Sequence, residues 1–120
     1  MKTLLIVDDE EDICEIVAIN LEEFPLNILL AYSGQQALKM MAESAIDFVI
    51  SDIQMPQMNG VELFAKMKEL YKDKNFKHIF MSGFADLDEK KARELGSLGL
   101  ISKPIDMNFL CNLVKKELAL

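Results

Sequence analysis

Five polar side chains of this sequence could do chemistry together, because each lies at or just after the end of a short apolar run. They are Asp8, Asp9, Asp52, Ser82 and Lys103. Three carboxylates held close together repel one another, and a divalent cation is the natural compensation. A site with few oxygen ligands and room for water suits Mg²⁺, so we expect a magnesium site here.

The chemistry that fits this set is phosphoryl transfer. An aspartate such as Asp52 can act as a nucleophile and form an aspartyl phosphate. Mg²⁺ and the ammonium of Lys103 can offset the charge of a transferring phosphoryl group, and the Ser82 hydroxyl can donate one hydrogen bond to it. Taken singly, Asp52 could be a cap, Ser82 a turn residue and Lys103 a solvated charge. Their shared place after apolar runs favours the joint interpretation.

The elements that must position these side chains alternate between short apolar runs and longer stretches with helical spacing. Solid runs bounded by polar residues predict strands buried on both faces; they lie at residues 4–7, 28–31, 48–50, 79–81 and 100–101. The helical stripes between them are Ile13, Val17, Leu21 and Phe24; Ala37, Leu38, Met41 and Ala45; Leu63, Phe64, Met67 and Leu70; and Leu110, Leu113, Val114 and Leu118. The stretch at 86–95 has few apolar positions, which is typical of a surface helix or of a weakly packed element that moves.

Cap and turn residues separate these stretches. Ser33 can cap the N-terminus of the second helix, and Asp106 can cap the last one. Five strand–helix units predict an α/β fold: a doubly wound, five-stranded parallel sheet in the order 2-1-3-4-5 with five helices. The first and third strands are neighbours in this order. That places Asp8 and Asp9 beside Asp52 at the carboxyl edge of the sheet, where ligands bind in such folds.

Length and composition set the class of protein. The 120 residues are enough for one domain, so we expect a single domain over 1–120. The formal net charge of −7 argues against direct nucleic-acid binding. No apolar run is long enough for a membrane span. The N-terminal apolar run meets acidic residues too early for a secretory signal, so we expect a cytoplasmic protein.

The cysteines and the histidine suggest no further site. Cys14 and Cys111 have no metal-ligand spacing or disulfide pattern, and we interpret them as small apolar residues on two different helices. His78 is the only histidine. We expect it to be solvated at the start of a strand, because nothing near it in the sequence suggests a zinc site or a catalytic triad.

Five segments together resemble the receiver domain of response regulators in two-component signalling. They are LIVDDE at 5–10, SDIQMP at 51–56, MNG at 58–60, MSG at 81–83 and ISKP at 101–104. Each segment alone is a weak signal, but all occur in the family's order and at its intervals over residues 2–118. The resemblance agrees with the predicted sheet and implies a flavodoxin-like fold.

The resemblance implies a role for each residue. Asp52 would accept a phosphoryl group from the phosphohistidine of a sensor histidine kinase or histidine phosphotransfer protein. Asp8, Asp9, Asp52 and the backbone carbonyl of Gln54 would hold Mg²⁺, while Ser82 and Lys103 would contact the phosphoryl oxygens. The bond before Pro104 would be cis. The protein would be a phosphoacceptor switch that catalyses its own phosphorylation and slow dephosphorylation. Its output surface would be the face of the fourth helix, fifth strand and fifth helix.

Three positions depart from the family pattern. Leu100 stands where the family usually has an aromatic residue that swings inward, so we expect a readout without that swing. Gly83 replaces the usual alanine and would loosen the loop after the fourth strand. Phe84 lies two residues beyond Ser82, and we hypothesise that it slows hydrolysis of the phosphoryl group.

Other interpretations remain open at this stage. Ile16 and Ile19 lie off the core stripe of the first helix and are either scattered surface residues or part of a docking site for the phosphodonor. A phosphohydrolase of the haloacid dehalogenase type also uses an aspartate with Mg²⁺. It needs a second aspartate two residues after the nucleophile, and Gln54 occupies that position. A receiver-like scaffold that is never phosphorylated is disfavoured by the complete set of five polar residues.

Overall fold

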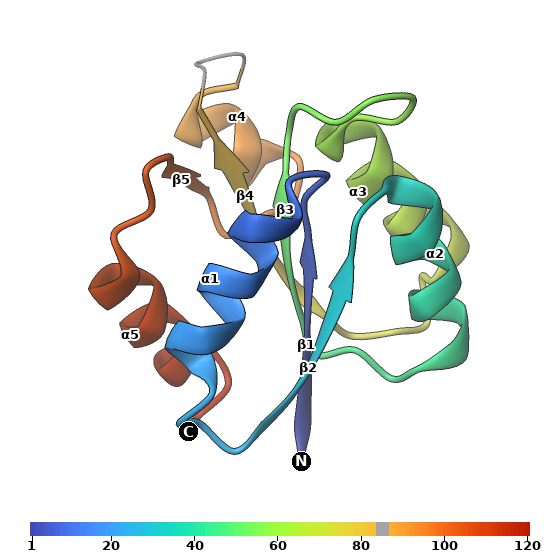
Figure 1. Ribbon diagram of the computed structural model, residues 1–120. Helices are drawn as coiled ribbons and strands as arrows, with labels where there is room; N and C mark the ends of the chain where they lie inside the picture. The colour runs from blue at the N-terminus through green and yellow to red at the C-terminus, as the bar shows by residue number, and fades with distance from the viewer. Residues whose placement is uncertain (84–86) are drawn as a thin grey trace.

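The computed structural model describes residues 1–83 and 87–120. Its centre is a five-stranded sheet in the order β2-β1-β3-β4-β5, with every neighbouring pair parallel (Figure 1). The doubly wound order predicted from the sequence is therefore confirmed. The strands are β1 (Lys2–Val7), β2 (Leu26–Ala31), β3 (Phe48–Asp52), β4 (Lys77–Ser82) and β5 (Leu100–Ser102).

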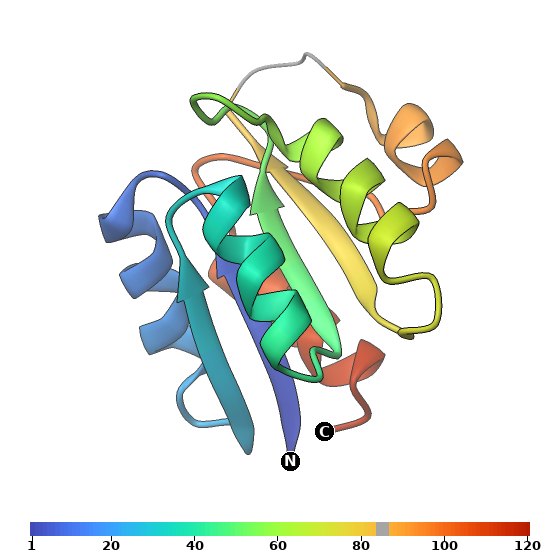
Figure 2. The ribbon, with the colours of Figure 1, turned by 90° about the vertical axis from the view of Figure 1, so that its right-hand side faces the viewer.

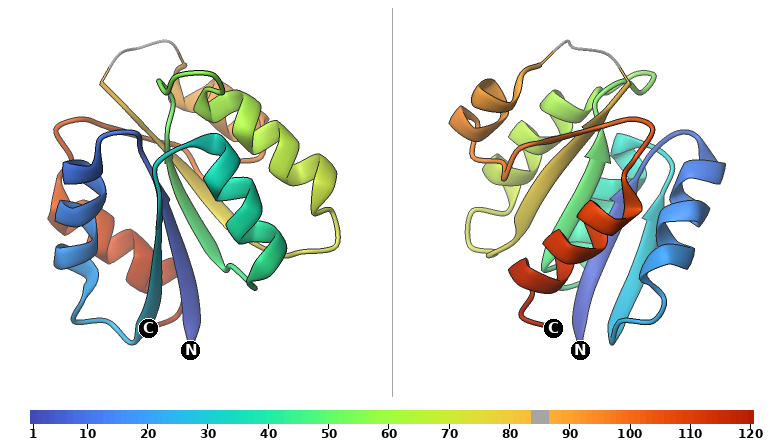
Figure 3. Two further views of the ribbon diagram at one scale, coloured as in Figure 1. Left: turned by 45° about the vertical axis from the view of Figure 1, so that its right-hand side comes forward. Right: turned by 90° about the vertical axis from the view of Figure 1, so that its left-hand side faces the viewer.

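Five helices cover the two faces of this sheet (Figures 2 and 3). Helices α1 and α5 pack on one face, and α2, α3 and α4 pack on the other. Their bounds are α1 (Glu11–Leu21), α2 (Gly34–Glu43), α3 (Gly60–Leu70), α4 (Glu89–Glu94) and α5 (Met107–Glu117). This arrangement leaves the carboxyl edge of the sheet uncovered by helices.

Alternate residues of the central strands face opposite helix layers. Leu4, Ile6, Phe48 and Ile50 pack with α1 and α5, whereas Leu5, Val7 and Val49 pack with α2 and α3. This is the two-residue period of a strand buried on both faces. All of these side chains are fully buried, so the register of β1 and β3 is strongly fixed.

Side-chain caps set where several helices begin. The Ser33 hydroxyl accepts a hydrogen bond from the Gln36 amide, and the Asp106 carboxylate accepts one from the Phe109 amide. Both predicted caps are thus confirmed. Asn59 and Glu62 form a reciprocal capping box at the start of α3.

Three expectations from the apolar pattern were wrong in part. Strand β2 is the sheet edge, and most of its residues are only half-buried rather than covered on both faces. Leu70 closes the predicted stripe of α3 but is 59 % exposed, because the helix ends there and its last turn projects beyond the core. In the described part of the sparse stretch, residues 87–95, the helix is limited to Glu89–Glu94. Phe84 lies outside the described residues.

His78 is the clearest correction. It lies in β4 and is 2 % exposed, although the sequence suggested a solvated residue. Its ring stacks on Phe64 of α3 at 4.0 Å between centroids and meets the edge of Phe80 at 4.4 Å. Burial, with a further contribution from the charge of Lys68, lowers the pKa of His78 to about 3. The imidazole is therefore neutral at physiological pH.

None of the helices in the described parts of the chain could span a bilayer.

The buried His78 predicts a specific pH dependence of stability. Its pKa is about 6.5 in the unfolded chain and about 3 in the folded one, so below pH 6.5 the unfolded state binds a proton that the folded state does not. Stability must therefore fall as the pH falls through this window. The His78 contribution between pH 7 and pH 5 is a loss of roughly 2 kcal/mol in the free energy of unfolding.

Urea unfolding of the wild type and of His78→Gln at both pH values measures this contribution. Glutamine retains a donor and an acceptor but does not titrate, and all other titrating groups cancel in the comparison. The wild type should lose roughly 2 kcal/mol more than the variant. Parallel pH profiles would show that the histidine is not buried as a neutral group.

Candidate functional site

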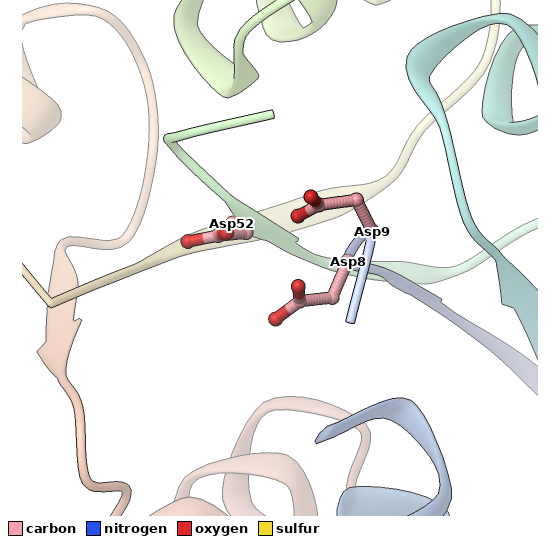
Figure 4. A group of neighbouring side chains, drawn as sticks. All are labelled: Asp8, Asp9 and Asp52. Atoms are coloured by element: carbon pink, nitrogen blue, oxygen red, sulfur yellow. The ribbon is translucent and has the colours of Figure 1, made fainter. Parts of the chain in front are cut away.

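Three carboxylates converge where β1 and β3 end at the carboxyl edge of the sheet. One oxygen from each of Asp8, Asp9 and Asp52 lies within 4.8 Å of the others, and Figure 4 shows the three side chains extending to the same side of the strand ends. Asp8 and Asp52 are buried and Asp9 is exposed. Because β1 and β3 are paired neighbours, residues more than forty positions apart meet here, as the sequence predicted.

Backbone and side-chain hydrogen bonds fix Asp8 in place. Its amide donates to the Ala31 carbonyl at 3.1 Å, which extends the β1–β2 pairing by one residue. Its Oδ1 accepts from the Glu10 amide at 2.9 Å, so the chain turns sharply from β1 toward α1. Below it, the Cys14 thiol lies 3.6 Å from the Asp8 carbonyl, and burial raises the pKa of this thiol to about 12. Cys14 is therefore an inert core residue, as expected.

Lys103 reaches the acids from the far side of the site. Its Nζ lies 2.9 Å from Asp8 Oδ2 and 3.4 Å from Asp52 Oδ2. Burial alone would lower its pKa, but the hydrogen bonds and charges of Asp8 and Asp52 together raise it. The peptide bond to Pro104 is cis, as predicted. The ammonium thus supplies the positive charge that partly offsets the two buried carboxylates.

The ionised form of Asp52 remains destabilised despite this lysine. Burial and then the nearby charge of Asp8 raise its pKa to about 6, against the opposing effect of Lys103. A carboxylate in this state gains from any further cation placed beside it.

Ser82 and Gln54 complete the set of predicted residues. Ser82 ends β4, is 4 % exposed, and its carbonyl accepts from the Lys103 amide at 2.8 Å. It pairs in register with Ser102, the residue before the lysine. Gln54 lies in the exposed loop two residues after Asp52. Strands β1, β3, β4 and the chain after β5 thus deliver the five polar side chains to one edge of the sheet.

Two nearby features were not assigned to the site from the sequence. Glu10 Oε1 lies 3.9 Å from Lys103 Nζ, although the sequence placed only Asp8 and Asp9 of this acidic run in the site. Gly60 approaches the backbone of Asp52: a Cβ built on it would lie 2.1 Å from the Asp52 carbonyl oxygen. The sequence identified MNG at 58–60 only as one of the segments that resemble receiver domains, and the folded loop reveals this close approach.

Comparison with known proteins agrees with this geometry. The family model described as the response regulator receiver domain matches residues 4–115. The chain belongs to the response regulator receiver domain family. It is therefore a phosphoacceptor switch domain of the two-component type.

Individual relatives support the same family. Sporulation initiation phosphotransferase F of Bacillus subtilis is 32 % identical over 118 residues, which cover 98 % of this chain and 94 % of that protein. The transcriptional regulatory protein ZraR of Salmonella typhimurium is 31 % identical over 117 residues, or 97 % of this chain. The matched segment is only 26 % of ZraR, so this chain spans about a quarter of such relatives.

Solved structures share the fold over nearly the whole chain. The Thermotoga maritima response regulator TrrA, solved in complex with Mg²⁺ and BeF, is 30 % identical and has a TM-score of 0.83, covering 98 % of this chain and 99 % of that one. The signal receiver domain of an HD domain-containing protein from Pseudomonas fluorescens Pf-5 is 30 % identical with a TM-score of 0.86, covering 98 % and 94 %.

The residues of this receiver domain fit a magnesium ion. The converging donors are all carboxylate oxygens, which Mg²⁺ prefers, and they include no thiolate or imidazole. The set is small and one member is exposed, which leaves room for the waters that Mg²⁺ retains. The raised pKa of Asp52 is a second indication, because a divalent cation would stabilise its ionised form.

The close approach of Gly60 predicts a large effect of a small substitution. In Gly60→Ala the new methyl group would meet the Asp52 and Ile53 backbone, which cannot rotate away as a side chain could. We expect a loss of about 3 kcal/mol in the free energy of unfolding, at the upper end of overpacking costs. Urea unfolding measures this loss.

Gly83→Ala is the matched control, since nothing lies within 4 Å of a Cβ built there. We expect this variant to remain within about 0.5 kcal/mol of the wild type. Equal stabilities for the two variants would mean that the loop after β3 does not lie against Asp52 in solution.

Proposed function

We propose that this receiver domain accepts a phosphoryl group on Asp52 from the phosphohistidine of a histidine kinase or histidine phosphotransfer protein, in a reaction that requires Mg²⁺. The observation that supports this most directly is the single site in which Asp8, Asp9, Asp52 and Lys103 converge. We further propose that residues 1–120 form one receiver domain, consistent with one sheet packed between two helix layers.

In the proposed transfer, an oxygen of the Asp52 carboxylate attacks the phosphorus atom. The new O–P bond forms as the P–N bond to the donor imidazole breaks, and the imidazole leaves with the electron pair of that bond. Lys103, already 3.4 Å from Asp52, offsets charge on the transferring group. Ser82 donates a hydrogen bond to one phosphoryl oxygen.

Asp8, Asp9, Asp52 and the backbone carbonyl of Gln54 would hold the magnesium ion. When bound, the ion would neutralise charge on the carboxylates and on the phosphoryl oxygens. Lys103 can move its ammonium from Asp8 toward the phosphoryl group, because a lysine stem is flexible and its charge is a point donor.

Phosphorylation would then shift the α4-β5-α5 face. The added group carries about −1.5 to −2 charges and strong acceptors, and its contacts with Ser82 and Lys103 can favour a second arrangement only if they differ between the two states. Leu100 of β5 is half-buried beside the cluster that includes Phe80 and Ala92. The readout would therefore depend on backbone and aliphatic shifts rather than on an aromatic swing.

The chemistry of the site disfavours the two rival functions. A dehalogenase-type phosphohydrolase needs an acid at the position of Gln54, whose side chain does not titrate. An unphosphorylated scaffold would have no need for three converging acids and a half-buried lysine, which cost free energy to bring together.

An apolar groove beside the site is the proposed docking surface for the phosphodonor. It holds about 300 Å³ and is lined by Ile13, Ile16, Lys103, Pro104, Ile105 and Met107. Ile16 and Ile19 are 47 % and 61 % exposed, as expected for residues off the core stripe. The groove shares Lys103 with the site, so a partner bound here would approach Asp52.

Replacement of the acceptor tests the central proposal. Incubation with acetyl phosphate and Mg²⁺ should add one phosphoryl group to the wild type, and Asp52→Asn should add none because an amide is not a nucleophile here. Removal of Mg²⁺ with EDTA should abolish labelling of the wild type. Intact-protein mass spectrometry measures each case, and labelling of Asp52→Asn would show that another residue is the acceptor.

A second prediction concerns the docking groove. Ile16→Asp places a charge in the groove and should slow transfer from a phosphorylated histidine phosphotransfer protein by about tenfold or more, the cost of burying one unpaired charge at an interface. Leu70→Asp is the matched control, since Leu70 is similarly exposed but lies on α3. Labelling by acetyl phosphate should be unchanged in both variants. Equal transfer rates from the protein donor would exclude this groove.

A further inference from the structure

A buried hydrogen-bond chain links β3 to the segment between α4 and β5. Ser51 Oγ lies 2.8 Å from His78 Nε2, and His78 Nδ1 lies 2.9 Å from Ser97 Oγ. The three residues are 0 %, 2 % and 6 % exposed. The chain runs on the α3 side of the sheet, where the His78 ring stacks on Phe64, and the proposed phosphoryl transfer does not use it.

The proton count selects one arrangement of this chain. Ser97 Oγ donates to the His78 carbonyl at 2.9 Å, so its oxygen is left to accept from His78 Nδ1–H. Nε2 is then the unprotonated nitrogen and accepts from the Ser51 hydroxyl. The opposite tautomer would turn the Ser51 hydroxyl away from His78, and the described part of the chain offers that hydroxyl no second partner. The Nδ1–H tautomer therefore gives each donor and acceptor of these three side chains a partner.

The two ends of this hydrogen-bond chain lie next to Asp52 and next to the segment that leads into β5. Ser51 immediately precedes Asp52 in β3. Ser97 begins the segment that leads into β5, and the His78 carbonyl also accepts from the Leu98 amide at 2.7 Å. His78 thus holds this segment through its ring Nδ1, which bonds Ser97 Oγ, and through its carbonyl, which accepts from the Ser97 hydroxyl and the Leu98 amide. It holds β3 through its other ring nitrogen.

These polar contacts matter because α4 has little apolar packing. It is six residues long, and only Ala92 within it is buried. Lys68 of α3 donates to the Leu95 carbonyl just after the helix. A fully satisfied buried network rigidifies what it connects, and breaking one member leaves a costly unpaired group.

We propose that the Ser51–His78–Ser97 chain holds the segment between α4 and β5 in the arrangement of the unmodified receiver domain and so opposes the switch. His78 and Ser97 are positioning residues, since neither touches the phosphoryl group. The inference rests on the proposed function, because the switch it opposes is the one that modification of Asp52 would favour. Loss of the Ser51–His78–Ser97 hydrogen bonds must raise the free energy of the unmodified state relative to the modified one.

Ser97→Ala is the decisive variant. It leaves His78 Nδ1–H without an acceptor in the unmodified state, so the apparent affinity for beryllofluoride with Mg²⁺ should rise by about fivefold or more over the wild type, the usual lower range of allosteric coupling. A merely structural role would leave the affinity unchanged or lower it. Ser97→Thr retains the hydroxyl and should restore the wild-type affinity, and Ser44→Ala serves as a serine control at the far end of the sheet.

Nitrogen-15 NMR supplies an independent readout, because His78 is the only histidine in the chain. The wild type should show the Nδ1–H tautomer, and its ring signals should change when beryllofluoride and Mg²⁺ bind. An Nε2–H tautomer, or an unchanged or weaker affinity in a folded Ser97→Ala, would overturn the inference while the proposed function stands. Absence of beryllofluoride binding by the wild type would overturn the proposed function and this inference with it.

Discussion

Electrostatic repulsion at the carboxyl edge of the sheet is the constraint on which the site depends. Asp8 and Asp52 are both buried, and Lys103 is the cation that lies within 3.4 Å of both. One ammonium does not fully compensate the burial of Asp52 and the charge of Asp8, which together raise the pKa of Asp52 to about 6. The rest of the fold holds these groups together although their proximity costs free energy. The buried β1–β3 pair prevents the carboxylates from separating. A cation bound beside them would therefore lower the free energy of the ionised site, and so would a phosphoryl group that contacts Lys103.

Strand alternation gives the two faces of β3 separate tasks. Phe48 and Ile50 pack with α1 and α5, and Asp52 follows them at the same two-residue interval toward the acids and Lys103. Val49 packs on the opposite face, and Ser51 follows it to His78. Consecutive residues therefore belong to two polar systems, one open to ligands and one sealed beneath α3. A shift of β3 that changed the contacts of Asp52 would also change the hydrogen bond between Ser51 and His78, because the two residues are consecutive in one strand.

The local sequence patterns correctly predicted the order of strands and helices and the residues that cap two of the helices. Solid apolar runs, caps at Ser33 and Asp106, and strict strand–helix alternation gave the element order, and the topology rules then placed Asp8 beside Asp52. The errors all concern tertiary surroundings. His78 was interpreted as solvated because its ring partners, Phe64 and Ser97, are distant in sequence. The exposure of Leu70 and the contact of Gly60 with Asp52 likewise depend on where α3 lies on the sheet, which periodicity cannot specify.

The distribution of apolar and polar contacts explains why a change at Asp52 would be felt near α4 rather than elsewhere. Helices α1, α2, α3 and α5 each bury at least two residues in the core, so moving them would expose apolar surface. The short α4 buries one, and the chain after it is held by directional hydrogen bonds from Lys68 and to His78. Directional bonds can exchange between discrete partners at small net cost, whereas apolar burial lost on displacement is not regained. Ser97 already faces two carbonyls, those of His78 and Gly99, with one hydroxyl proton to donate. The part of the sheet edge farthest from β2 is thus the part in which two arrangements can have similar free energies.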